Sequence, residues 1–216
     1  MTDTVPSLRE RNRQLVRDVV LDAAERLLAR DDAGDFSMRA LALEAGVGFA
    51  TPFNHFGSKN AIMQALSARI IDRMSDRFRT DAPSGNAIDR VLAMAQIAVT
   101  LLLEQPKVYR TVVGSLSAPN TGTSAVHKRS RALWAEALGK FDGIAPSSRS
   151  TAEASLAEQI AFTIRGCLSF WIAGEIDDAE LHRKVCGAIS TVLLGFAGPA
   201  HRSALQDTIR AAGQNR

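Results

Sequence analysis

Cysteine is scarce in this chain, which has only two such residues, Cys167 and Cys186, among 216. They show no paired C-x-x-C spacing, which argues against a disulfide framework or a zinc site. Both fall inside apolar helical patterns, where a small buried side chain is the usual role, although His182 lies one helical turn before Cys186 and leaves a redox role open. We therefore expect a protein of the reducing cytoplasm with no metal and no cofactor.

Long apolar runs are also missing. Runs such as residues 97–103 are far too short to span a bilayer, and the N-terminal residues are polar and charged. We therefore expect neither a secreted nor a membrane-embedded protein. The net charge of +3 is compatible with DNA binding but does not decide it.

The sequence has none of the common catalytic motifs. It contains no G-x-S-x-G elbow, no H-E-x-x-H pair and no Walker loop. Its four histidines are scattered along the chain, at His55, His127, His182 and His201. We expect the protein not to be an enzyme.

Helical periodicity runs through almost the whole chain, and no segment makes a convincing β-strand. Ser7 and Glu10 form a capping box before a helix that ends near Arg30, and Ser58 precedes a long helix that reaches about Phe78. The further predicted helices span residues 87–104, 107–117, 124–141, 151–173, 179–196 and 201–212. The predicted fold class is all-α.

Residues 36–59 read as two short helices joined by a three-residue turn, which is the helix-turn-helix pattern. Ser37 is suited to capping the first helix, and Gly46 ends it because glycine takes the left-handed conformation that a sharp turn needs. Arg39 lies in the first turn of this motif, and Lys59 opens the helix that follows it.

The second helix of the motif, about residues 49–56, is expected to direct Ala50, Phe53 and Phe56 toward the domain. Its other side chains face elsewhere, namely Phe49, Thr51, Asn54 and His55. In a helix-turn-helix, such outward positions enter the major groove of DNA.

The run from Gly46 to Lys59 resembles the signature of the tetracycline-repressor (TetR) family of bacterial regulators. The residues in register are Gly46, Val47, His55, Phe56, Gly57, Ser58 and Lys59. The chain departs from the family pattern at Gly48, Pro52 and Phe53. Proline in a first helical turn is tolerated because most N–H groups there have no helical partner.

The resemblance implies a helix-turn-helix DNA-binding domain at residues 13–73, preceded by a basic arm at residues 1–12. Residues 74–216 would then form a helical ligand-binding and dimerisation domain. The positions that the motif and the resemblance assign to DNA contact are Arg11, Ser37, Arg39, Gly48, Phe49, Thr51, Asn54, His55 and Lys59.

Two later helices, each starting with a capping-box pattern (Ser150 with Glu153, Asp177 with Glu180), supply the predicted dimer surface. Its residues are Ile164, Cys167, Trp171, Val185, Ile189 and Val192. An aromatic-lined cavity would take a small apolar ligand, and its candidates are Met94, Tyr109, Trp134, Phe162 and Phe170. Plain core packing is the alternative role for both sets.

The resulting hypothesis is a ligand-responsive transcriptional regulator, most simply a repressor. It would bind a palindromic double-stranded DNA operator as a homodimer, and a small apolar effector would release it. The alternative is a helical ligand-binding or accessory protein of the same fold without operator binding.

Overall fold

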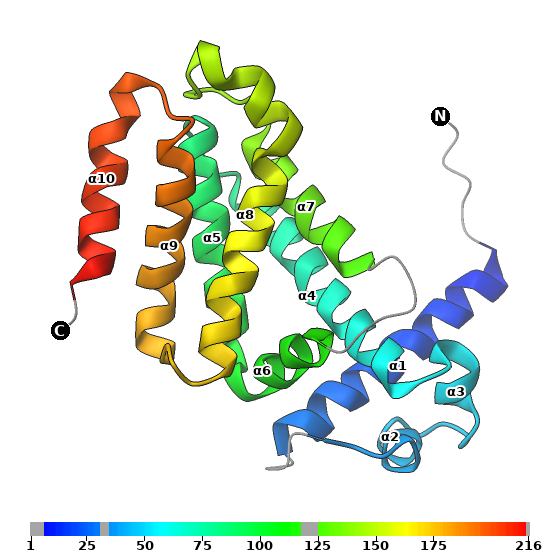
Figure 1. Cartoon of the computed structure of the whole chain (residues 1–216). Coiled ribbons are helices and arrows are strands. Elements are labelled where there is room, and N and C mark those ends of the chain that lie inside the picture. Colours follow the sequence, from blue (N-terminus) through cyan, green and yellow to red (C-terminus); the bar gives the residue numbers. More distant parts are fainter. Residues whose placement is uncertain (1–6, 31–34, 118–124, 215–216) are drawn as a thin grey trace. The chain divides into compact units, whose positions relative to one another are not determined.

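The computed structural model describes residues 7–30, 35–117 and 125–214. Within these ranges the chain is helical and has no β-strand, which confirms the all-α prediction (Figure 1). The helices are α1 (Leu8–Arg30), α2 (Met38–Glu44), α3 (Thr51–Phe56), α4 (Lys59–Asp81), α5 (Ala87–Glu104), α6 (Pro106–Gly114), α7 (Ala125–Leu138), α8 (Arg149–Ile172), α9 (Asp178–Leu194) and α10 (Pro199–Gly213). None of the helices in these ranges has the length and apolar character needed to cross a membrane.

Helix starts follow the capping residues in most places. The Ser7–Glu10 capping box is formed, since the Ser7 N–H donates to the Glu10 carboxylate and the Glu10 N–H donates to Oγ of Ser7. Asp177 caps α9 by accepting from the N–H of Glu180 at 2.7 Å. The residues of the predicted arm that the structure describes therefore begin α1, while residues 1–6 of that arm lie outside the described residues.

The capping box predicted at Ser150 is wrong. A short 3₁₀ turn at Pro146–Ser148 leads directly into α8 at Arg149, so Ser150 is already helical. The Glu153 carboxylate accepts a hydrogen bond from Nε of Arg149 at 3.0 Å instead of from a backbone N–H at the helix start. The rigid φ of proline starts the turn earlier than the serine pattern suggests.

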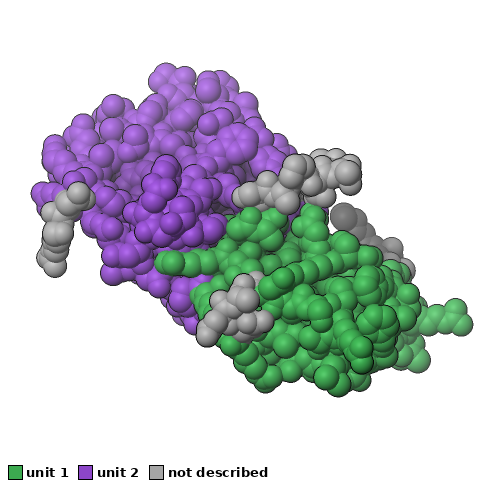
Figure 2. Space-filling model, turned by 60° about the horizontal axis from the view of Figure 1, so that its bottom comes forward, with its two compact units in different colours: residues 1–67, 107–118 green, residues 68–106, 119–216 purple. Residues whose placement is uncertain are grey.

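The chain divides into two compact units (Figure 2). Unit 1 comprises residues 1–67 and 107–118, and unit 2 comprises residues 68–106 and 119–216. Helix α4 begins in unit 1 and continues into unit 2, so one helix belongs to both. The boundary expected after residue 73 falls within this same helix.

In unit 1, α1 packs against α2 and α3, and α2 packs against α3. The core side chains packed between these helices are mostly small or aliphatic, which lets the short helices approach closely. The buried residues include Val20, Ala23, Ala24, Leu28, Leu41, Ala42, Ile62, Met63 and Leu66. This core holds the helix-turn-helix.

In unit 2, α9 is the central helix, because α5, α8 and α10 all pack against it (Figure 1). Its inward face repeats every four residues, with Leu181, Val185, Ile189 and Leu193 all fully buried. Trp171 of α8 is also fully buried, and its indole N–H donates to Asp178 at 2.7 Å.

Helix α10 approaches α9 very closely at one point. Gly187 of α9 lies against Ala212 of α10, and a Cβ atom added at Gly187 would collide with the Cβ of Ala212. Near this point, Nη1 of Arg183 donates to the backbone carbonyl oxygens of Ala212 and Gln214, at 2.9 and 2.7 Å. The guanidinium thereby satisfies carbonyl groups that the end of a helix leaves without partners.

Candidate nucleic-acid interface

The helix-turn-helix begins with a capped α2. Oγ of Ser37 accepts a hydrogen bond from the Ala40 N–H at 3.0 Å, which confirms Ser37 as the N-cap. Gly46 has a φ of +65°, as the turn requires, and the N–H of Val47 donates to the carbonyl oxygen of Ala42 at 3.0 Å. These contacts fix the angle at which the chain leaves α2 and enters α3.

Helix α3 forms although Pro52 departs from the TetR family pattern. It begins at Thr51, later than the expected residue 49, so Pro52 stands in its first turn, where no helical partner for an N–H exists. Pro52 is also the buried residue of α3. At the other end, Gly57 has a φ of +77°, and its N–H donates to the carbonyl oxygen of Phe53 at 2.8 Å.

The predicted inward face of α3 is partly wrong. Ala50 and Phe53 are exposed, and only Phe56 is half-buried. The reason is the helical period: Pro52 and Phe56, four residues apart, share the inner face of α3, so Phe53 lies on a neighbouring, exposed face. The rings of Phe49 and Phe53 pack edge to face, with their centroids 6.1 Å apart.

Arg17 of α1 holds the C-terminal end of α3. Its guanidinium carbon lies 4.2 Å from the centre of the Phe56 ring, and Nη1 donates to the carbonyl oxygen of His55 at 2.5 Å. The charge stacks on the ring face, where the negative end of the ring quadrupole attracts it. Arg17 therefore braces α3 from within the domain.

His55 is half-buried beside two cations. Burial lowers the pKa of His55, and the charges of Arg13 and Arg17 lower it further. Its Nδ1 atom is buried and has no hydrogen-bond partner among the described residues. Burial and the two neighbouring cations therefore favour the neutral ring, and its assigned DNA contact remains a prediction.

Lys59, assigned above to DNA, has partners inside unit 1. Its ammonium group forms an ion pair with Asp35 and lies 5.0 Å from the centre of the buried Phe36 ring. Burial lowers the pKa of Lys59. These contacts help to close the loop before α2 onto the start of α4.

The other assigned side chains are available on the surface of unit 1. Arg11, Ser37, Arg39, Gly48, Phe49 and Asn54 are exposed, whereas Thr51 is half-buried. Several of these residues bear charged or hydrogen-bonding groups, which are the groups that bind DNA phosphates and base edges. Their roles toward DNA stay predictions.

Sequence reasoning missed one clamp between α1 and α2. The carboxylate of Glu44 accepts hydrogen bonds from Nε of Arg26 at 2.7 Å and from Nη1 of Arg30 at 2.9 Å. The hydrogen bond from Arg26 is the main cause that lowers the pKa of Glu44. The sequence places Arg26 and Arg30 four residues apart, and hence on one face of a helix. It does not indicate that Glu44, which is distant in sequence, accepts their hydrogen bonds.

The candidate ligand residues do not share one environment. Met94 and Trp134 are buried in the core of unit 2, and Tyr109 is buried in unit 1. Phe162 and Phe170 are more than half exposed on α8, at 53% and 52%, so they do not line an enclosed cavity. Core packing accounts for Met94 and Trp134.

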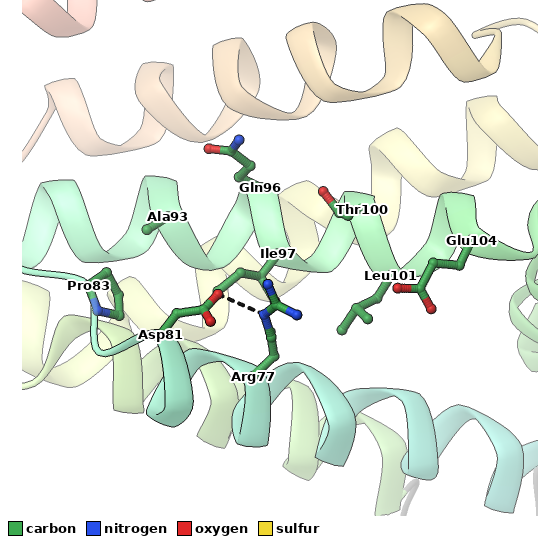
Figure 3. A pocket seen from close by; sticks show the side chains of 9 residues that line it. All are labelled: Arg77, Asp81, Pro83, Ala93, Gln96, Ile97, Thr100, Leu101 and Glu104. Carbon is green, nitrogen blue, oxygen red and sulfur yellow. Dashed lines mark hydrogen bonds and ion pairs between the residues drawn. The ribbon is translucent and has the colours of Figure 1, made fainter.

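A groove of about 350 Å³ lies between the second half of α4 and α5, within unit 2 (Figure 3). Ile97 and Leu101 point from α5 toward α4, where Arg77 and Asp81 form an ion pair at 2.8 Å. The remaining lining residues are Pro83, Ala93, Gln96, Thr100 and Glu104. This volume lies at the lower end of the range for small-molecule sites.

Most of the predicted dimer residues are core residues in this structure. Ile164, Trp171, Val185 and Ile189 are buried inside unit 2, which differs from the surface role expected for them, because α9 lies between α8, α5 and α10. Cys167 and Val192 are half-buried. The outward side of α8 instead carries Phe162, Gly166 and Phe170.

The cysteines are poorly suited to redox sensing. Burial raises the pKa of the Cys186 thiol to about 11 and also raises that of Cys167. Nε2 of His182 lies 3.7 Å from Sγ of Cys186, yet the thiolate, which is the reactive form, is disfavoured. Among the residues that the structure describes, no group of three or more His, Cys, Asp or Glu is placed to bind a metal ion.

The helix-turn-helix region is similar to known DNA-binding proteins. The family model described as bacterial regulatory proteins of the tetR family matches residues 20–66, which contain α2 and α3. The HTH-type transcriptional regulator AlkX of Mycobacterium tuberculosis is 35% identical over 85 residues. That match covers 38% of this chain and only 40% of the relative's length.

Solved structures extend the likeness of the fold to most of the chain. A TetR transcriptional regulator from Rhodococcus sp. RHA1 superposes with a TM-score of 0.68 at 21% identity, covering 84% of this chain and 97% of that one. A gamma-butyrolactone receptor superposes with a TM-score of 0.52 at 13% identity, covering 94% and 100%. The helix-turn-helix geometry and the matching family model agree that residues 20–66 carry the DNA-binding fold of the TetR family, and most of the chain shares the all-helical fold of these solved structures.

Proposed function

We propose that the protein is a ligand-responsive transcriptional repressor that binds a roughly palindromic operator as a homodimer. The observation that carries the proposal is the surface of α3. Pro52 and Phe56 turn inward, so Asn54 on α3 and Phe49 in the turn before it are left exposed, and Arg17 braces the helix. A rigid helix with exposed side chains at its N-terminal end is what base reading in the major groove requires.

Exposed arginines on unit 1 suit the phosphates beside that groove. Arg9, Arg11 and Arg13 are exposed in the first turns of α1, and Arg39 is exposed in the first turn of α2. Their guanidinium groups bind phosphate oxygens in a bidentate manner and release counterions from DNA. Lys59 makes a weaker candidate because it is paired with Asp35.

A dimer supplies the second copy of α3 that a palindromic operator needs. The exposed apolar rings of Phe162 and Phe170 on α8, with Gly166 between them, are available for packing against a second chain. Two recognition helices related by a two-fold axis reach successive major grooves when they lie about 34–36 Å apart.

The groove between α4 and α5 is the proposed effector site. Its lining combines the apolar Ile97 and Leu101 with the charged Arg77, Asp81 and Glu104, so it suits a small, mainly apolar molecule with a polar end. Because α4 continues into unit 1, a ligand that shifts α4 changes how the recognition helices are presented. Coupling of about 1–3 kcal/mol is enough for release. The likeness to a gamma-butyrolactone receptor supports an effector of small size.

The test of operator binding is fluorescence anisotropy over a salt series, with sequences selected from random DNA. Arg39→Gln is expected to weaken binding to every sequence and to reduce the salt slope by about one. Asn54→Ala is expected to change base preference, with about 1–3 kcal/mol lost at one position of the site. If Asn54→Ala left both affinity and preference unchanged, the proposed orientation of α3 would be wrong.

The effector site is tested by a substitution that places a large side chain in the groove between α4 and α5. Thr100→Trp is expected to lower operator affinity without any ligand and to abolish binding of an apolar fluorescent probe such as anilinonaphthalene sulfonate. Gln206→Trp, at an exposed position of α10, adds the same ring outside the groove and is the matched control. Equal behaviour of both variants would remove the groove from the proposal.

The second candidate is a helical ligand-binding or accessory protein that does not bind an operator. The pairing of Lys59 with Asp35 favours it, since that pair withdraws one cation from the motif. Complete loss of salt-dependent DNA affinity in the anisotropy experiment would favour this candidate over the repressor.

A further inference from the structure

Two aromatic rings are exposed together at the start of the recognition helix. Phe49, in the turn before α3, is 61% exposed, and Phe53, in the first half of α3, is 44% exposed. Their planes meet at 61° with centroids 6.1 Å apart, so they cover each other only along one edge. Asn54, the neighbour of Phe53, is exposed as well.

This arrangement leaves apolar surface in water that core packing does not explain. Pro52 and Phe56 already occupy the inward face of α3, so neither ring completes the core of unit 1. Burial of the remaining exposed surface of a ring against an apolar partner stabilises the contact. The pair therefore favours a partner surface that offers apolar groups to the N-terminal end of α3.

The major groove of DNA offers one kind of apolar group, the C5-methyl group of thymine. The other groups exposed there are hydrogen-bond donors and acceptors, and the phosphates at the rim are charged. In a helix-turn-helix, the N-terminal residues of the second helix contact the base edges. The two rings occur at that end of α3.

We propose that Phe49 and Phe53 are specificity-determining residues that contact thymine methyl groups in each operator half-site. This inference rests on the proposed operator binding. Their centroid separation of 6.1 Å corresponds to about two base steps of 3.4 Å, so the contacted thymines lie within about two steps of each other. Asn54 beside them suits the N6 and N7 atoms of adenine, which makes the half-site rich in A·T pairs.

The experiment replaces thymine by deoxyuridine, one position at a time, in an operator selected from random DNA. Deoxyuridine keeps every hydrogen-bonding atom of thymine and lacks only the methyl group. Wild-type protein is expected to lose about fourfold in affinity for each contacted methyl group. The double variant F49A/F53A is expected to bind the thymine and deoxyuridine operators equally.

Leu43→Ala is the matched control, because it removes an 85% exposed apolar side chain from α2 and leaves α3 unchanged. It is expected to keep the discrimination of the wild type. Since Phe49 and Phe53 are exposed, thermal unfolding of F49A/F53A is expected to match that of the wild type, which separates loss of contact from loss of fold.

Equal binding of thymine and deoxyuridine operators by the wild type at every position would overturn the inference. Unchanged discrimination in F49A/F53A would overturn it too. Both results leave selective operator binding, and hence the proposed function, intact. Absence of selective binding to any DNA would overturn the inference together with the proposed function.

Discussion

Arg17 of α1 donates a hydrogen bond from Nη1 to the backbone carbonyl oxygen of His55 at 2.5 Å, while its guanidinium stacks on the Phe56 ring. One side chain thus joins the first helix to the last turn of α3. The contact uses a carbonyl group that the end of a short helix leaves without an intrahelical partner.

Arg17→Ala is expected to lower the free energy of unfolding by about 1–2 kcal/mol, because both the hydrogen bond and the ring contact are lost. Chemical denaturation followed by circular dichroism measures this. Arg11→Ala removes the same charge from an exposed position of α1 and is expected to change stability by less than about 0.5 kcal/mol. Equal effects of the two substitutions would show that Arg17 acts only through its charge.

His55 is expected to make stability depend on pH. Burial and the charges of Arg13 and Arg17 hold its pKa in the folded state below the ordinary value of 6.5. The unfolded chain therefore binds more protons at this residue, so the folded state loses stability as the pH falls below about 6.5.

His55→Gln is expected to reduce this loss. The measurement is the difference in Tm between the wild type and the variant at pH 8, 6.5 and 5.5. As the pH falls, the Tm of the variant is expected to rise relative to that of the wild type. Arg17→Ala is expected to reduce the dependence as well, since one of the two cations is gone. A Tm difference that does not change with pH would contradict the assignment of this pH dependence to His55.

Gly187 is expected to tolerate no larger residue while Ala212 faces it. Gly187→Ala places a Cβ atom on the Cβ of Ala212 and forces α10 away from α9, at a cost of about 1–3 kcal/mol. The second substitution Ala212→Gly restores the space and is expected to recover part of that stability. Thermal unfolding of the single and double variants measures both effects.

Gly166→Ala is the control for the loss of glycine in a helix. A Cβ atom at Gly166 of α8 meets nothing within 4 Å, so this substitution is expected to raise stability by up to about 1 kcal/mol. Stabilisation by Gly187→Ala of the same size would show that α9 and α10 are not in tight contact at that point.

The cysteines are expected to react slowly in the folded protein. With the pKa of Cys186 raised from 9.0 to about 11, little thiolate is present at neutral pH. Iodoacetamide labelling at pH 7.5, followed by mass spectrometry, is expected to be much slower than in the unfolded chain. The raised pKa also predicts stability that is present below pH 9 and lost as the pH rises toward 11. Fast labelling of Cys186 in the native protein would contradict this prediction and would support a redox role for that residue.

Helix positions were determined by local features of the sequence. The span 87–104 coincides with α5, the caps at Ser7, Ser37 and Asp177 are formed, and Gly46 adopts the positive φ of the turn. Periodicity and capping act within a few residues, so the chain itself carries this information. The family signature is local in the same sense.

The tertiary structure decided which side chains face inward and which charges find partners. Burial of Pro52 displaced Phe53 to the surface, and Asp35 paired with Lys59. Packing of α9 against α5, α8 and α10 converted Val185 and Ile189 from predicted dimer residues into core. These outcomes depend on contacts between segments far apart in sequence, because an apolar stripe specifies a buried face without specifying what covers it.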